Sequence, residues 1–512
     1  LALEMLRGQA RRTPPPQWVR VIGGWTEFQF AEKRMPTLDE INAASPDTPV
    51  FVLHLYDRAM VNRAGLRALG YTKDTPDFPA GQIQRDKAGN PTGLLIAKPN
   101  ALILYASLAK GPKLGFDDQV NSTRHFMREL NRLGITSCID AGGGFQNYPD
   151  DYRVIEQLAE KDELTLRIAY NLFTQKPKEE YDDFARWIGM TEPGKGSDVY
   201  RMNGAGEMLV FSAADFEDFL EPRPNLQPIM EAELQKVVGL LAAKRWPFRL
   251  HATYDESISR FLDVFEAVDR ETPFNGLRWF FDHAETISEK NMERVKRLGG
   301  GIAIQDRMAF QGEYFVARYG AEAAKRTPPI TRMLELGIPV GAGTDATRVS
   351  SYNPWVSLYW LISGRTVGGL PLYDGKNRLD RTAALRLYAE GSSWFSGDDG
   401  KKGRIAVGQL ADLAALSADY FTVPENEIKG IEAELTIMGG KIVHGSGDFT
   451  PLAPPLPPVS PDWSPVVSYG GYHRGAAADP VLHKGCACHS PRQVWLPKES
   501  RFWGLGCDCF AF

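Results

Sequence analysis

One pattern recurs along the chain: an amphipathic helix, a glycine stop and a short apolar strand. The helix predicted at 117–133 carries apolar residues at helical spacing and ends at Gly134, where the strand ITSCID follows. A second helix is predicted from near Ser288, and a third from Thr327 with Pro328 in its first turn. Proline near the start and glycine past the end are typical helix boundaries. Helices alternating with strands at this spacing predict parallel βαβ units.

The apolar strands of this pattern number seven. They are predicted at 134–140, 165–172, 198–203, 247–252, 277–283, 300–305 and 338–345. A (β/α)8 TIM barrel needs eight strands. The chain begins with Leu, in what resembles the end of a helix. We therefore expect an α/β fold of this barrel type, with its first strand upstream of residue 1.

Changes in the pattern of apolar and turn-forming residues divide the chain into segments. The first 404 residues carry the barrel pattern, interrupted by a loop-rich insertion at about 15–115 with its own strand at Val50–His54. Beyond it, short alternating strands around the Gly439-Gly440 turn predict a small β-sandwich module. The predicted segments after the barrel are the β module at 405–450, a Pro-rich linker at 451–466 and a Cys/His-containing tail at 467–512.

Composition narrows the class of partner. The chain has 512 residues, 43% of them hydrophobic and 24% charged, with a formal net charge of −5. It has no basic excess of the kind that nucleic-acid binding requires. No apolar run approaches the roughly 20 residues that span a membrane. We therefore expect a small-molecule substrate, no nucleic acid, no membrane and a cytoplasmic location, with a homo-oligomer left open.

Polar residues end several of the predicted strands. His251, His283 and Asp345 end three of them, Gln305 ends another, and Glu207 follows a glycine-rich turn after YRMN. The active site of such a barrel lies at the carboxyl ends of its strands. Two imidazoles and a carboxylate suit a divalent ion of the zinc type, which activates water. The pattern predicts a metal site with His251, His283 and Asp345 as ligands.

Several ordered motifs resemble amidohydrolases of family 3, the YtcJ-like group. HATYDESISRFLDVFE is similar to the segment after the fifth strand of that family, and FFDHAETISEKNMERVKRLG to the sixth-strand segment. IPVGAGTDATRVSSYNPW is similar to the eighth-strand segment. The residues from AALRLYAEGSSWF onward are similar to the C-terminal part of the family, which leads into a small β-sandwich. The resemblance covers roughly residues 15–445. It implies a metal-dependent hydrolase that cleaves an amide or another non-peptide C–N bond.

The resemblance also implies roles for residues. His251 and His283 would be metal ligands, and Asp345 would be both a ligand and the general base. The first strand of the family ends in a His-x-His pair, which this chain lacks, so we expect that pair upstream. At the fourth strand, Arg201 stands where a two-metal member carries a carbamylated lysine. Either Glu207 replaces it as a bridging ligand or the site holds one metal, which we favour.

Three further residues are predicted to contact substrate: His54, Gln305 and Arg201. For His54, at the end of the insertion strand, a structural role is the alternative. The absence of the His-x-His pair and of the lysine motivates a second hypothesis for the whole chain. In that hypothesis, the barrel is a catalytically impaired ligand-binding protein with an incomplete metal site.

The tail holds a second candidate metal site. Cys486, Cys488, Cys507 and Cys509 form two close pairs. Four thiolates form tetrahedral zinc sites, whereas the tight Cys-x-Cys spacing also suits copper(I) or a redox pair. Disulfides in an exported protein, or no ordered role, are the remaining interpretations.

Overall fold

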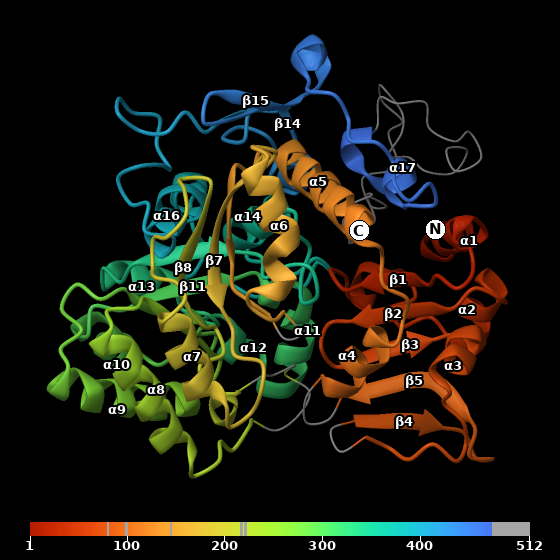
Figure 1. Ribbon diagram of the computed structural model, residues 1–512, viewed down its shortest axis with the longest axis horizontal. Coiled ribbons are helices and arrows are strands. Elements are labelled where there is room, and N and C mark those ends of the chain that lie inside the picture. Colours follow the sequence, from red (N-terminus) through yellow and green to blue (C-terminus); the bar gives the residue numbers. More distant parts are fainter. Residues whose placement is uncertain (79–80, 98–100, 144–145, 216–218, 220–222, 474–512) are drawn as a thin grey trace.

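A curled sheet of seven parallel strands is the centre of the fold (Figure 1). The computed structural model describes residues 1–78, 81–97, 101–143, 146–215, 219 and 223–473. The strands follow the chain in the order β12-β11-β10-β9-β8-β7-β6. Their bounds are β6 Ser137–Asp140, β7 Arg167–Leu172, β8 Tyr200–Ala205, β9 Phe248–Ala252, β10 Trp279–His283, β11 Gly301–Gln305 and β12 Val340–Gly343.

All seven predicted strands are confirmed, and so is their parallel pairing. In the described residues the seven strands form an open sheet with β6 and β12 at its edges, so the closed eight-stranded barrel, with its first strand upstream, stays a prediction. The sheet is a half-barrel whose apolar core is continuous with the surrounding helices.

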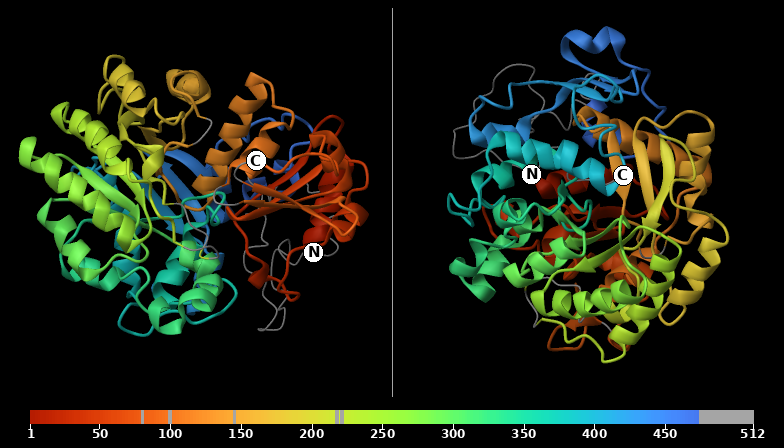
Figure 2. Two further views of the ribbon diagram at one scale, coloured as in Figure 1. Left: turned by 90° about the horizontal axis from the view of Figure 1, so that it is seen from below. Right: turned by 90° about the vertical axis from the view of Figure 1, so that its left-hand side faces the viewer.

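Helices cover the outer face of the half-barrel (Figure 2). The predicted helix at 117–133 is α5, and Ser288 caps α10 by accepting a hydrogen bond from the Asn291 amide. The third predicted helix starts later than expected, with Pro329 as its cap. The helices around the sheet are α5 Phe116–Arg132, α6 Arg153–Glu160, α7 Glu180–Ile188, α8 Met230–Ala243, α9 Asp255–Glu271, α10 Glu289–Arg297, α11 Arg307–Tyr319, α12 Ala321–Ala324, α13 Ile330–Glu335, α14 Pro354–Ser363, α15 Arg381–Arg386 and α16 Ser392–Phe395.

The insertion is an ordered layer with its own sheet, beside the half-barrel in Figure 1. We predicted one strand there; the structure has five, in the order β1-β2-β3-β5-β4, with hydrophobic clusters on both faces. Alternation in β5, which packs every second residue inward, was the signal that the loop-rich interpretation missed. The elements are α1 Ala2–Arg12, β1 Val19–Ile22, α2 Leu38–Ala44, β2 Val50–His54, β3 Arg58–Val61, α3 Arg63–Leu69, β4 Gly81–Arg85, β5 Pro91–Ala97 and α4 Leu102–Ala109.

The segment after the half-barrel is a single antiparallel sheet, not the predicted sandwich. Its strands are β13 Leu413–Leu416, β14 Ala433–Met438 and β15 Lys441–Gly445, and β14 and β15 form the hairpin at Gly439-Gly440. The sheet packs on α5, where the Thr436 hydroxyl donates to the Asn131 carbonyl at 2.6 Å. The helix thus covers the face that a second sheet would need. A short helix, α17 Val466–Tyr469, follows the Pro-rich segment.

Among the helices of the described residues, none combines the length and the apolar composition that crossing a bilayer requires.

Candidate metal centre

Three neighbouring strands bring the central residues of the site together. His251 lies near the end of β9, His283 ends β10, and Glu207 follows β8 by two residues. Because parallel neighbours present their carboxyl ends at the same edge of a sheet, these side chains converge. One ligand atom from each lies within 4.8 Å of the others, which makes them a possible metal-binding group.

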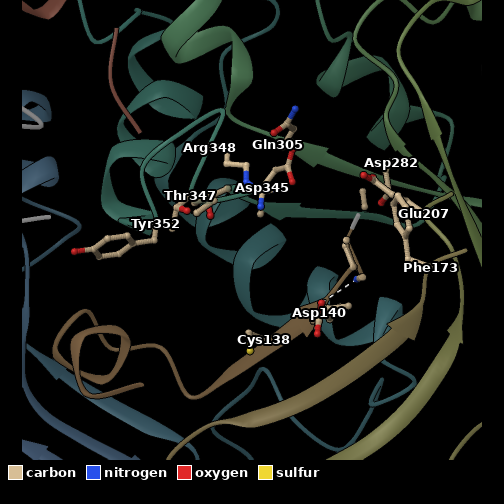
Figure 3. Close-up of a pocket in the computed structure, with 18 of the residues that line it drawn as sticks. Cys138, Asp140, Phe173, Glu207, Asp282, Gln305, Asp345, Thr347, Arg348 and Tyr352 are labelled. Carbon is tan, nitrogen blue, oxygen red and sulfur yellow. Dashed lines mark hydrogen bonds between the residues drawn. The ribbon is translucent and has the colours of Figure 1, made fainter. Parts of the chain in front are cut away.

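The geometry shows which atoms face the common point. Glu207 Oε2 lies 3.2 Å from His283 Nε2 and 3.6 Å from His251 Nδ1, and the two imidazole centroids are 4.2 Å apart. Glu207 and His283 line a cavity of about 2430 Å³. Figure 3 shows Glu207 beside Asp282, and Asp345 beside Gln305, among the residues that line this cavity.

Charge is concentrated at this point. Burial alone would raise the pKa of Glu207, but hydrogen bonds to the two imidazoles hold it well below its usual range. Burial opposes the charged form of His251, yet Glu207 raises its pKa to about 9. The carboxylate thus stays in its charged form at this point, which favours a positive charge beside it.

Gln305 connects His283 to Asp345. Oriented by its hydrogen bonds, the Gln305 amide oxygen accepts from His283 Nδ1 at 3.0 Å and from Arg307 Nη2 at 2.8 Å. Its amide nitrogen then donates to Asp345 Oδ2 at 3.1 Å. With Nδ1 occupied in this way, His283 presents Nε2 to Glu207 and the common point. Such outer contacts fix the orientation of a ligating imidazole.

Asp345 lines the cavity but stands outside the group formed by Glu207, His251 and His283. It follows β12 by two residues. Burial raises its pKa to about 6, and Glu207 adds to the shift. Its predicted roles as ligand and base remain predictions.

A second carboxylate, Asp215, supports His251 from the other side. Asp215 Oδ1 lies 3.6 Å from His251 Nε2, and the Asp215 carboxylate accepts from the backbone amides of Thr253 and Tyr254 at 2.9 and 3.0 Å. Asp215 is fully buried. It lies in a loop between β8 and α8, away from any strand end, and our search of strand ends could not find it.

Two residues predicted to contact substrate lie elsewhere. The Arg201 guanidinium bonds Asp398 at 2.6 Å near the amino end of β8, so Glu207 holds the carboxyl-end position that we had assigned to Arg201. His54 is fully buried between Glu27 and Asp57, and it is absent from the cavity lining. The tail cysteines lie outside the described residues.

The donor set fits a divalent metal. Two imidazole nitrogens and a carboxylate oxygen are borderline ligands of the kind that zinc binds. Glu207 and His283 of this group line the cavity, so a further coordination position can face it.

Comparison with protein families gives the class of the chain. The model of the amidohydrolase family matches residues 2–444, which is most of the chain. The protein therefore belongs to amidohydrolase family 3.

Individual relatives are distant but cover nearly the whole chain. YtcJ of Bacillus subtilis (strain 168), named as a candidate amidohydrolase, is 24% identical over 86% of this chain and 82% of its own length. The N-substituted formamide deformylase of Arthrobacter pascens is 24% identical over 86% of this chain and 81% of its own. An uncharacterised metal-dependent hydrolase from Pyrococcus horikoshii OT3 shares the fold, with a TM-score of 0.56 at 19% identity, covering 82% of this chain and 85% of that one.

Proposed function

We propose that this protein hydrolyses an amide or another non-peptide C–N bond of a small molecule with the help of a divalent metal, zinc by its donor set. The observation that carries the proposal is the convergence of His251, His283 and Glu207 beside a large cavity, which His283 and Glu207 line. Membership of the amidohydrolase family supports it. In this assignment His251 would hold the ion through Nδ1 and His283 through Nε2, because those atoms face Glu207.

The residues divide the chemistry between them. A bound divalent ion supplies Lewis acidity that activates water at neutral pH. The Asp345 carboxylate, held at Oδ2 by the Gln305 amide, accepts the proton of the attacking water. The water oxygen adds to the carbonyl carbon and the C–N bond breaks. The amine then leaves with the proton that Asp345 returns to its nitrogen.

Metal analysis of the purified full-length protein tests the site. We expect about one zinc-type ion per chain, lost in His283→Ala and retained when the four tail cysteines are replaced by serine. His444→Ala is the matched control, because His444 is a buried histidine of the β module whose Nε2 donates to the Ala433 carbonyl, away from the cavity. Metal that survives His283→Ala but disappears with the tail cysteines would refute the assignment.

Activity is measured next on N-substituted formamides, because one relative carries that substrate in its name. We expect release of formate and amine by the zinc-loaded protein, with kcat reduced about 100-fold or more in Asp345→Asn. A protein that binds zinc but hydrolyses no member of an amide panel would instead support the ligand-binding alternative.

A further inference from the structure

A positively charged side chain faces the cavity close to Asp345. Arg348 lies three residues after Asp345 on the loop that follows β12, and both residues line the cavity (Figure 3). Three residues of chain span at most about 10 Å. The Arg348 guanidinium is therefore within reach of a small molecule whose reacting bond lies at Asp345.

Two tyrosines of the insertion hold this guanidinium. Arg348 Nη1 donates to the Tyr105 hydroxyl at 3.1 Å, and the guanidinium carbon lies 4.6 Å from the centroid of the Tyr105 ring. The hydroxyl of Tyr56 is its other partner. Tyr105 comes from α4 and Tyr56 from the turn between β2 and β3, and both line the cavity. The insertion thus builds one side of this position, and the half-barrel builds the other.

Arg348 differs in its partners from Arg249 and Arg404, two other arginines that line the cavity. Arg249 is paired with Asp282 by two hydrogen bonds of 2.6 Å, and Arg404 is paired with Glu390. Within the described ranges, the Arg348 guanidinium has hydroxyl partners and no carboxylate within 4.0 Å. A partly buried guanidinium has five N–H donors and a charge that is costly to desolvate without an anion. The Arg348 guanidinium therefore favours an anionic ligand that binds in the cavity.

We propose that Arg348, Tyr56 and Tyr105 form a subsite for a carboxylate of the substrate, so that the preferred substrates are N-acylated amino acids or similar anionic amides. A guanidinium pairs with a planar carboxylate through two parallel N–H···O bonds. A singly charged carboxylate suits this cavity better than a dianionic phosphate, because Asp140, Asp282 and Asp345 also line it. This inference specifies the substrate class of the proposed hydrolase. It rests on that proposed function, because a ligand of this subsite is a substrate only if the protein hydrolyses it.

A matched pair of ligands tests the subsite without turnover. N-formylphenylalanine and N-formyl-2-phenylethylamine differ only by the carboxylate, and their binding is measured by calorimetry on the full-length His283→Ala protein. We expect the carboxylate compound to bind about tenfold tighter or more, and this preference to disappear in His283→Ala/Arg348→Gln. Equal affinities for the two compounds, or a preference that survives Arg348→Gln, would overturn the subsite.

Arg404→Gln on the same background is the control, because Arg404 also lines the cavity but already has a carboxylate partner. We expect it to keep the preference, and a loss there equal to that in Arg348→Gln would assign the effect to net charge and refute the subsite. Inorganic phosphate that displaces N-formylphenylalanine at equal concentration would refute the choice of a carboxylate.

The same ligands separate this inference from the proposed function. In the wild-type protein with zinc, we expect kcat/KM for N-formylphenylalanine to exceed that for the neutral twin by a similar factor, lost in Arg348→Gln. Carboxylate-selective binding without hydrolysis of either compound would leave the subsite standing and the hydrolase refuted. Hydrolysis of both compounds at equal kcat/KM, with equal binding, would refute the subsite and leave the hydrolase standing.

Discussion

Asp215 is the buried carboxylate that supports His251. Replacing it by asparagine keeps the shape of the side chain and one oxygen for the backbone amides, but removes the negative charge beside His251 Nε2. Since such outer carboxylates orient ligating imidazoles, we expect zinc affinity to fall about 10- to 100-fold in Asp215→Asn. Competition with a chromogenic chelator measures this affinity. Asp182→Asn, on the exposed face of α7, is the control, and an unchanged affinity in Asp215→Asn would contradict the assignment.

His54 predicts a pH dependence of stability. Burial lowers its pKa, but Asp57 at 2.7 Å and Glu27 at 2.6 Å outweigh burial and raise the pKa to about 9. Arg58 and Tyr314 pack on these two carboxylates. A histidine whose pKa is raised by folding contributes stability that is complete below its unfolded pKa of about 6.5 and lost as the pH rises through 9.

Unfolding by urea at pH 6.5 and pH 9 measures this contribution. The free energy of unfolding of the wild type should fall, relative to His54→Gln, by on the order of 3 kcal/mol between these values. A difference between the two proteins that does not change with pH would show that His54 is not charged in the fold.

At the scale of single residues, the sequence predicted site residues at or near the ends of strands and missed those in loops. His251, His283 and Glu207 were found because strand order alone places them at one edge. Asp215 lies in a loop whose path the pattern does not determine. Similarly, the burial of His54 depends on Glu27, which packs against it from a different element.

A buried ion pair is one of the contacts that join the half-barrel to the β module. Arg167, at the start of β7, donates to Asp412 through Nε at 2.7 Å and Nη2 at 3.1 Å, and each side chain is 6% exposed. Removing one partner leaves the other charge buried without compensation, so Asp412→Ala should cost about 3 kcal/mol of unfolding free energy. Chemical denaturation measures the loss. Lys441→Ala, which breaks an exposed pair with Asp162, should change stability far less; equal losses would contradict the argument.

The elements of the half-barrel were predicted well because their signal is local. Each strand is a short apolar run bounded by a helix stop, and its pairing follows from the βαβ rule. The insertion and the β module depend on which strand pairs with which. β1, for example, pairs in parallel with β2 across α2, a long connection that the sequence pattern does not specify.

At the scale of the whole molecule, the insertion sheet closes on the loop that carries Asp345 and Arg348. Gly23 and Gly24 follow β1 and lie against this loop, and the Gly24 amide donates to the Arg348 carbonyl at 3.3 Å. A Cβ on Gly23 would stand 2.1 Å from that carbonyl oxygen, so only glycine allows the two layers to meet here. The position of the insertion is thus coupled to the loop of the site.

Two glycine variants test this coupling. Gly23 (φ +69°) and Gly70 (φ +72°) share a left-handed backbone, but a Cβ on Gly70 would meet no atom within 4 Å. Alanine at either position therefore carries a similar backbone penalty of about 1 kcal/mol, whereas only Gly23→Ala pushes on the Arg348 carbonyl. Because a displacement of about 1 Å disturbs catalytic geometry, we expect kcat/KM of Gly23→Ala to fall about 10- to 100-fold below that of Gly70→Ala. Melting temperatures and formamide hydrolysis are measured on both variants. Equal kcat/KM in two folded variants would mean that the insertion and the loop of the site move independently.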